Sequence, residues 1–244
     1  FPENIVNFYN LKKKYGFYII EDACHALGAS YFDEQKKKYN YVGSCVHSDI
    51  STFSLHSVKS ITTGEGGIIT TNNYKISKKI NKLRSHGISR TNNYWEYDVD
   101  FSSLNFRLTD FQCALGISQL KKLKKFINYR KKTYEYYFKI LKRIDGISMP
   151  KYHKLNKSSF HLFIIHLKKF NYKRKSEFIK FLNKKFIFPQ FHYIPIYKFK
   201  IFNGNFLKNE AEVYYNRALS LPIFYGIKKK DQDYIGKKIK EYFK

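Results

Sequence analysis

The sequence predicts an α/β fold, and three observations support it. Helical and strand-like patterns alternate through the first half of the 244-residue chain, an acidic pair follows the short apolar run Tyr18–Ile20, and the pattern changes after Gly146. Alternation of this kind is typical of a mainly parallel sheet covered by helices. Such sheets bind ligands beyond the carboxyl ends of their strands, so the residues that follow each strand are the first candidates for a site.

The first half of the chain supplies the alternating elements. Apolar residues spaced three and four apart favour a helix over 3–15, and Gly16 is placed to end it. We expect strands over 17–20, 50–55 and 67–71 and a basic helix over 74–84. Residues 85–105 lack periodicity and are long for a connection, which indicates a functional loop.

Two further helices are expected before the pattern changes, over 108–126 and 129–144. In the second helix the apolar spacing places one set of side chains inside: Thr133, Tyr137, Ile140, Leu141 and Ile144. The remaining pattern suits a smaller α+β domain, with strands over 160–167 and 191–194 and helices over 175–185, 209–219 and 231–243. We therefore expect a large domain at 1–127 and a small domain at 128–244.

The composition argues against a nucleic-acid-binding protein, a membrane-spanning protein and a metal-binding protein. The formal net charge is +27, but only seven of the 46 basic residues are arginine, and the lysines are spread along the chain. This spread favours solvated surfaces over a nucleic-acid-binding patch. No apolar run reaches the roughly 20 residues that span a membrane. The three cysteines lack metal-ligand spacing, so we expect buried free thiols, no metal site and a cytoplasmic protein.

The strongest chemical signal is the pairing of Asp22 with Lys59. Asp22 follows the first expected strand, and Lys59 lies just past the second. Pyridoxal phosphate needs both residue types, because an amine must form a Schiff base with its aldehyde and a carboxylate must keep its pyridine nitrogen protonated. A carboxylate about 4 Å from that nitrogen stabilises the protonated ring by roughly 4 kcal/mol, or about three pKa units.

Each of these residues also has an ordinary structural explanation. Asp22 could cap a turn, and Lys59 could be one solvated lysine among many. Their positions after two strands favour the cofactor site. The glycines Gly64, Gly66 and Gly67 match no nucleotide-binding fingerprint, and we interpret them as letting the backbone turn tightly beside the lysine.

Five motifs together resemble one known family. They are Glu-Asp-Ala-Cys-His-Ala-Leu-Gly-Ala at 21–29, Phe-Ser-Leu-His-Ser-Val-Lys-Ser-Ile-Thr-Thr-Gly-Glu-Gly-Gly at 53–67, Leu-Arg-Ser-His-Gly at 83–87, Asn-Phe-Arg-Leu-Thr-Asp-Phe-Gln-Cys-Ala-Leu-Gly at 105–116 and Gln-Phe-His-Tyr-Ile-Pro-Ile at 190–196. On these motifs the chain resembles the DegT/DnrJ/EryC1/StrS family of sugar-nucleotide aminotransferases along essentially its whole length. The resemblance implies a fold type I pyridoxal phosphate enzyme that forms a homodimer with shared active sites.

The resemblance also implies roles for individual residues. Lys59 would bind the cofactor covalently and act catalytically, Asp22 would bind the pyridine nitrogen, and His25 would lie beside the ring. Ser54 would bind the phosphate, and Asn105 would reach the cofactor phosphate of the partner subunit. The residues that the resemblance places near the substrate are Arg107, Gln190, Phe191, His192 and Tyr193.

Two runs of the sequence, at 113–120 and 192–195, are most similar to family members that aminate C4 of a UDP-linked 4-keto-6-deoxy amino sugar on the way to pseudaminic acid. Glutamate would be the amino donor. Two alternatives stay open: an aminotransferase for another sugar nucleotide, of the perosamine or 3-amino sugar type, and a non-catalytic basic binding protein on the same fold. We assign no mechanistic role to His56 or His86.

One departure from the family pattern concerns its N-terminal third. That part carries a Gly-Thr phosphate-binding helix start and an aromatic residue that stacks on the cofactor, and this sequence, which begins at Phe1, has no counterpart to it. A helix N-terminus is a principal anion site. We therefore expect a fragment with weakened cofactor binding.

Overall fold

The structure is a computed structural model that describes residues 5–93, 95–150, 155–202 and 210–244. The chain divides into two compact units. Unit 1 consists of Phe1–Lys125 and His153–Ser159, and unit 2 consists of Phe126–Tyr152 and Phe160–Lys244. The return of 153–159 to unit 1 has no counterpart in the sequence patterns.

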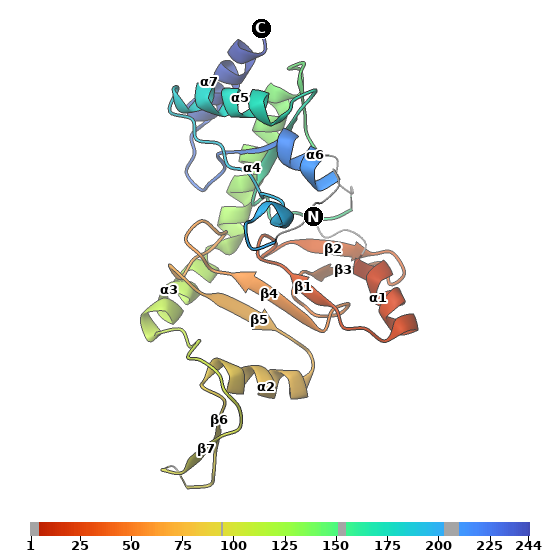
Figure 1. Ribbon diagram of the computed structural model, residues 1–244, viewed down its shortest axis with the longest axis vertical. Helices are drawn as coiled ribbons and strands as arrows, with labels where there is room; N and C mark the ends of the chain where they lie inside the picture. Colours follow the sequence, from red (N-terminus) through yellow and green to blue (C-terminus); the bar gives the residue numbers. More distant parts are fainter. Residues whose placement is uncertain (1–4, 94, 151–154, 203–209) are drawn as a thin grey trace. The chain divides into compact units, whose positions relative to one another are not determined.

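Unit 1 is built on a sheet of three strands in the order β1–β4–β5 (Figure 1). β1 (Ile20–Asp22) runs parallel to β4 (Ile50–Ser54), and β5 (Gly67–Thr70) runs antiparallel to β4. The parallel pair confirms the expected α/β arrangement, and β5 makes the described sheet mixed. The carboxyl ends of β1 and β4 and the start of β5 therefore lie at one edge, where open α/β sheets bind ligands.

The first strand differs from the prediction in position and burial. It begins at Ile20 rather than Phe17, and Tyr18 and Ile20 are 77% and 66% exposed. The apolar run does not mark a buried strand, because these two side chains are largely exposed among the described residues. The small apolar core of unit 1 is formed instead by Ala23, Ala29, Tyr31, Val42 and Phe53.

The helices α1 (Ile5–Tyr15) and α2 (Tyr74–Arg84) agree with the sequence patterns. Gly16 ends α1 as predicted, since it has a φ of +72° and its N–H donates to the Lys12 carbonyl. α2 has the predicted bounds, and the Asn73 side chain caps it by accepting a hydrogen bond from the Ile76 N–H. The predicted start of α1 at Glu3 lies outside the described residues.

The predicted helix over 108–126 is wrong at its end. α3 (Asp110–Leu120) stops before a turn at Lys121 and Lys122, and α4 (Leu123–Leu141) begins directly after it. Apolar spacing continues through the turn, so periodicity alone did not reveal the break. Thr109 caps α3 through a capping box with Gln112.

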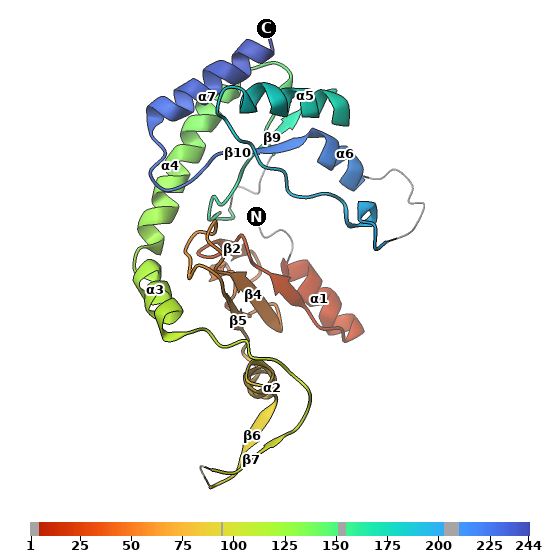
Figure 2. The ribbon, with the colours of Figure 1, turned by 60° about the vertical axis from the view of Figure 1, so that its left-hand side comes forward.

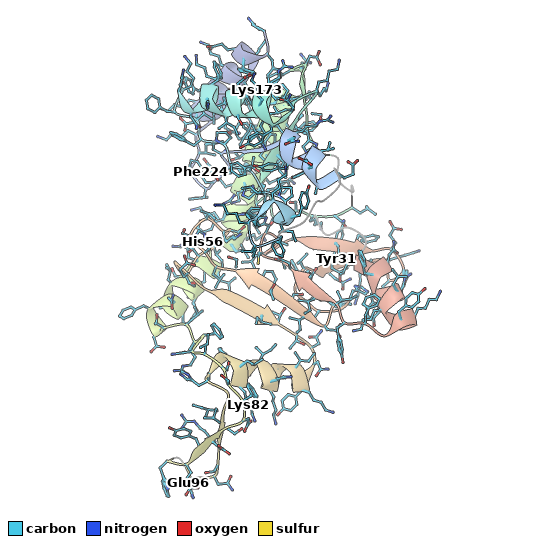
Figure 3. The ribbon with its side chains drawn as sticks, viewed as in Figure 1. Tyr31, His56, Lys82, Glu96, Lys173 and Phe224 are labelled. Carbon is cyan, nitrogen blue, oxygen red and sulfur yellow. The ribbon has the colours of Figure 1, made fainter. Side chains whose placement is uncertain are left out.

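Two short hairpins were missed by the sequence patterns. One pairs β2 (Ser30–Asp33) with β3 (Lys38–Tyr41), and the other pairs β6 (Ile88–Arg90) with β7 (Tyr97–Val99) inside the segment expected to be an irregular loop. The second hairpin is attached to α2 by Lys82 (labelled in Figure 3), whose ammonium donates to Ser89 and Asp100.

Unit 2 contains an antiparallel sheet in the order β10–β9–β8. Its elements after α4 are β8 (Ile147–Ser148), β9 (Phe163–Leu167), α5 (Tyr172–Asn183), the 3-10 helix η1 (Ile196–Lys198), α6 (Glu210–Arg217), β10 (Ala218–Leu221) and α7 (Lys229–Tyr242). Figure 2 shows α5 and α7 beside β9 and β10. The side chains predicted to lie inside α4 do so, except that Ile140 is half-buried and Ile144 follows the helix end.

Two predicted elements of unit 2 are wrong. Residues 191–194 form no strand, because Pro189 and Pro195 flank them. The preceding Gln190 forms only an isolated bridge, in which it exchanges two backbone hydrogen bonds with Ser220. The helix predicted over 209–219 ends at Arg217, and the chain continues directly as β10.

None of the described helices is long and apolar enough to cross a membrane. The described residues also contain no group of His, Cys, Asp and Glu side chains arranged to bind a metal. All three cysteines are free thiols, as expected, but only Cys45 is buried. Cys24 is half-buried and Cys113 is exposed on α3, so the prediction that the thiols are buried is wrong for these two.

Candidate active site

Three of the predicted site residues lie at one edge of the unit 1 sheet. Asp22 ends β1, Ser54 ends β4, and Lys59 is on the loop that joins Ser54 to Gly67 at the start of β5. The parallel pairing of β1 with β4, with Asp22 opposite Thr52, brings these strand ends together. The sheet therefore positions a carboxylate, a hydroxyl and an amine on the same side.

The loop that carries Lys59 is fixed at both ends by Leu55. The Leu55 N–H donates to the Gly66 carbonyl at 2.8 Å, and the Leu55 carbonyl accepts the Thr63 N–H at 3.0 Å and the Thr62 hydroxyl at 2.9 Å. Between these points the Lys59 N–H closes a turn onto the carbonyl of His56. The backbone of Lys59 is thus held by hydrogen bonds, while its side chain remains partly exposed.

The glycines beside this loop adopt the backbone conformations that the sequence interpretation requires. Gly64 has a φ of +81° and Gly66 a φ of +150°. A Cβ at Gly66 would lie 2.5 Å from the Thr63 hydroxyl and 2.8 Å from Leu108. A tight turn next to Lys59 is therefore confirmed for these two positions, whereas Gly67 belongs to β5.

Asp22 is held as a carboxylate. The Asp22 Oδ1 accepts a hydrogen bond from the Cys24 N–H at 3.1 Å. Hydrogen bonds from Cys24, followed by the positive charges of His25 and Lys59, lower the pKa of Asp22 below its usual value. The same neighbours affect Cys24, because burial and the carboxylate of Asp22 raise the pKa of its thiol. Asp22, His25 and Lys59 are therefore close enough to interact electrostatically.

His25 is in a short turn that follows β1. The Ala26 N–H donates to the Ala23 carbonyl and the Ala29 N–H to the Ala26 carbonyl, both at 2.8 Å. The His25 carbonyl accepts a hydrogen bond from the hydroxyl of Ser159, which is only 2% exposed. Ser159 therefore supports the backbone at His25.

Ser54 and His56 interact with each other within the loop. The Ser54 hydroxyl accepts the His56 N–H at 3.3 Å. The His56 Nε2 lies 3.6 Å from a carboxylate oxygen of Glu65, and both side chains are largely exposed. His56, labelled in Figure 3, therefore acts as a loop residue in this structure, and the Ser54 hydroxyl stays at the strand end where a phosphate oxygen could reach it.

Asn105 and Arg107 lie on the segment before α3. Asn105 forms an isolated bridge with Ser85, and its side-chain oxygen accepts the Arg107 N–H at 3.1 Å. Both residues are exposed. Among the described residues neither side chain has a hydrogen bond or ion pair with Asp22 or Lys59. His86, with a φ of +62°, is a loop residue beside them.

The predicted substrate segment 190–193 belongs to unit 2 and is anchored to β10. Gln190 pairs with Ser220 through two backbone hydrogen bonds of 2.9 and 2.7 Å, and the His192 Nδ1 is 3.1 Å from the Ser220 hydroxyl. Phe191 packs edge-to-face against Tyr215, and Tyr193 is 64% exposed.

Sequence reasoning missed two residues that support the site. The Cys24 N–H orients Asp22, and this could be found from the sequence, because a carboxylate commonly accepts the N–H two residues later. The contact of Ser159 with the His25 carbonyl joins residues 134 positions apart, and no sequence signal indicates it.

The residues at the sheet edge fit pyridoxal phosphate. A carboxylate with a lowered pKa suits a protonated ring nitrogen, a partly exposed lysine on a fixed loop suits the aldehyde, and the Ser54 hydroxyl suits a phosphate oxygen. The described part of unit 1 also exposes the carboxyl ends of β1 and β4, the usual ligand position in this class of sheet.

The chain is similar to known proteins both in sequence and in structure. The UDP-4-amino-4,6-dideoxy-N-acetyl-beta-L-altrosamine transaminase of Campylobacter jejuni serotype O:23/36 is 38% identical over 229 residues, which cover 93% of this chain and 58% of that protein. The solved structure of Helicobacter pylori PseC, an aminotransferase involved in pseudoaminic acid biosynthesis, superposes with a TM-score of 0.87 at 30% identity and covers 99% of this chain and 64% of that one.

A third similar protein is Spr1654 from Streptococcus pneumoniae, solved in a form that contains PLP. It has a TM-score of 0.82 and 25% identity and covers 95% of this chain and 59% of that one. The chain thus spans about three fifths of the length of the relatives it matches. The model of the DegT/DnrJ/EryC1/StrS aminotransferase family matches residues 2–240. The chain therefore belongs to this family, with the fold of the pyridoxal-phosphate-dependent sugar aminotransferases.

Proposed function

We propose that the protein is an aminotransferase that uses pyridoxal phosphate to move an amino group from glutamate to C4 of a UDP-linked 4-keto-6-deoxy amino sugar. The observation that carries this proposal is the assembly of Asp22, His25 and Lys59 at one sheet edge, with charges that interact. The similarity to the Campylobacter transaminase supports the choice of sugar.

Lys59, Asp22 and Ser54 at the sheet edge each have a role in this proposal. The cofactor, when bound, supplies an electron sink that makes the proton on the amine-bearing carbon labile. The Lys59 Nζ holds the cofactor and then, as a free amine, moves that proton. The Asp22 carboxylate keeps the ring nitrogen protonated, which it can do because its own pKa is lowered. Ser54 donates its hydroxyl to the phosphate.

The proposal also assigns roles to residues away from this edge. Asn105 and Arg107 are exposed on the segment before α3, and we assign them to the cofactor phosphate and to a substrate anion in the site of a partner subunit of a homodimer. The segment Gln190–Tyr193 is assigned to the sugar nucleotide. Its exposed Phe191 and Tyr193 rings offer apolar faces to a base or a sugar.

The test compares Asp22→Asn with the matched variant Asp98→Asn, whose carboxylate is exposed on β7. Asp22→Asn should still bind the cofactor covalently but lose at least about a hundredfold in kcat with glutamate, because the ring nitrogen loses its charged partner. Asp98→Asn should behave like the unsubstituted protein. Equal turnover by the Asp22→Asn protein would refute the role of Asp22.

The sugar is tested separately. The protein is supplied with glutamate and, in turn, the UDP-linked 4-keto-6-deoxy amino sugar, a GDP-linked 4-keto sugar and a dTDP-linked 3-keto sugar, and the position of the new amine is read by NMR. Amination at C4 of the UDP sugar is the expected result. Preferential turnover of either other sugar would replace the proposed substrate and leave the aminotransferase assignment intact.

A further inference from the structure

A buried lysine in unit 2 has no assigned role. Lys175, on α5, is 1% exposed, and within the described residues no carboxylate forms an ion pair with it. Burial alone lowers the pKa of Lys175 to about 8, so the side chain remains mostly an ammonium at neutral pH. A buried charge without an ionic partner is costly and is retained only where other contacts stabilise it.

The contacts that stabilise this ammonium come from α6 and from the predicted substrate segment. The Lys175 Nζ donates to the Tyr215 carbonyl, and it lies 4.1 Å from the centroid of the Tyr215 ring and 5.6 Å from that of the Phe191 ring. Both distances are within the range of cation–π attraction. The Tyr215 ring also stacks with Tyr172, at 5.9 Å between centroids.

The carbonyl that Lys175 contacts is at the end of a helix. α6 ends at Arg217, so the Tyr215 carbonyl is one of the last four and has no N–H partner within the helix. A cation at this position satisfies the carbonyl and interacts favourably with the helix dipole. Lys175 therefore fixes the point at which α6 becomes β10.

The strand that begins at that point contacts the segment 190–193. β10 begins at Ala218, and its Ser220 carries both backbone hydrogen bonds of Gln190 and the side-chain contact with His192. Phe191, between these two residues, meets Tyr215 edge-to-face at 6.1 Å and also faces Lys175. Lys175 thus contacts the anchor of the segment and the segment itself.

We propose that Lys175 is a positioning residue that holds Phe191 and its neighbours in the conformation that binds the sugar nucleotide. This inference rests on the proposed function, because that function assigns 190–193 to the substrate. Lys175 does not touch the reacting atoms in this account. Its ammonium contacts Phe191 in a loop that also binds Ser220 and packs against Tyr215.

The test compares Lys175→Met, which keeps an unbranched apolar side chain and removes the charge, with Lys173→Met. Lys173 is exposed on the same helix (Figure 3). Hydrogen exchange over 188–196 should rise about tenfold or more in the Lys175→Met protein only. The KM for the sugar nucleotide should rise about tenfold while kcat changes by less than about threefold, because the loop binds substrate and performs no chemistry.

The Phe191→Leu variant provides a second test of the proposal, in which Lys175 is kept. Phe191 is 41% exposed, so this variant should fold. If the two residues act together, Phe191→Leu should raise KM in the unsubstituted protein and change it little further in the Lys175→Met background. KM increases that multiply in the double variant would overturn the proposal.

The hydrogen-exchange and KM measurements together distinguish a failure of this inference from a failure of the proposed function. Unchanged exchange at 188–196 in Lys175→Met would overturn the positioning role whatever the activity. Faster exchange with an unchanged KM would also overturn it and leave the proposed function standing. If the unsubstituted protein turned over no sugar nucleotide, the proposed function would fail, and with it the role of Lys175 in substrate binding.

Discussion

Unit 2 and unit 1 bury their apolar side chains to different extents. In unit 2, Phe163, Ile165 and Leu219 on adjacent strands are 0% exposed, and α4, α5 and α7 add further buried side chains. In unit 1, Ile20 and Ile69 on the sheet are 66% and 51% exposed, and α1, α2 and α3 contain no buried residue. The candidate site residues with the proposed chemistry lie in the unit whose described helices contain no fully buried side chain.

This difference indicates how the site is held. In unit 1 the positions of Lys59 and Asp22 depend on hydrogen bonds from Leu55 and Cys24 rather than on a dense apolar core. Hydrogen bonds fix a backbone without covering its side chains, so the lysine and the carboxylate stay accessible to a ligand. In unit 2 the described core is largely apolar, and function is assigned to the segment 190–193 and to the buried Lys175 that contacts it.

The largest expected effect comes from a matched pair of core substitutions. Leu219 in unit 2 and Leu55 in unit 1 are 0% and 2% exposed, but only Leu219 belongs to a large apolar cluster. Leu219→Ala should lower the free energy of unfolding by about 4 kcal/mol and Leu55→Ala by about 2 kcal/mol, because the cost of a cavity depends on its surroundings. Urea unfolding of both variants measures this, and equal losses would contradict the comparison.

A second pair compares two glycines of unit 1 that share a φ of +72°. A Cβ at Gly87 would lie 2.1 Å from the carbonyl oxygen of Phe101, whereas a Cβ at Gly16 would have no atom within 4 Å. Gly87→Ala should therefore cost about 3 kcal/mol, and Gly16→Ala only the backbone strain of about 1 kcal/mol. Thermal unfolding of both variants is the measurement. Similar costs would mean that the turn at Gly87, between α2 and β6, relaxes freely.

The sequence predicted part of this architecture for identifiable reasons. α2 was found with its bounds because Asn73 caps it and its apolar spacing is regular. The strand β10 was missed because its first residues continue a helical pattern. They form a strand by pairing with β9, and local propensity does not predict such a tertiary contact. The four-residue strands β2 and β3 are too short to give a clear period.

The sequence indicated the proximity of the candidate site residues more readily than the contacts that support them. Asp22, Ser54 and Lys59 each follow or end a strand, and strand order alone brings them to one edge. The contact of Ser159 with His25 depends on the chain returning to unit 1 after residue 153, and local patterns cannot indicate such a return. The sequence also could not reveal that Lys175 is buried, because lysine side chains are usually exposed.

The smallest expected effect is a pH dependence in unit 1. Buried His47 contacts the Tyr31 hydroxyl at 2.7 Å and lies 3.4 Å from Asp33 (Tyr31 is labelled in Figure 3). Burial lowers the pKa of His47 below its ordinary value of 6.5, although Asp33 acts in the opposite direction. The unfolded chain therefore takes up the proton first, so stability falls as the pH drops below 6.5 and levels off below the folded pKa.

His47→Gln removes this titration and serves as the comparison. The melting temperature of the unsubstituted protein should fall more between pH 7.5 and pH 5.5 than that of the variant, because only the former must bury a histidine that prefers to be charged. Asp22 and Asp49, whose pKa values are lowered, titrate below this range. Parallel curves for the two proteins would show that His47 does not contribute to the acid sensitivity.

The central claim is that Lys59 and the carboxylate of Asp22 form a pyridoxal phosphate site at the edge of the unit 1 sheet. Reduction of the protein with borohydride after incubation with pyridoxal phosphate, followed by peptide mapping, tests it most directly. Because 39 of the 46 basic residues are lysines, chance labelling would be spread over many exposed lysines. We expect one peptide, containing Lys59, to carry the label, and the Lys59→Ala protein to lose it. Labelling concentrated on any other lysine would contradict the account.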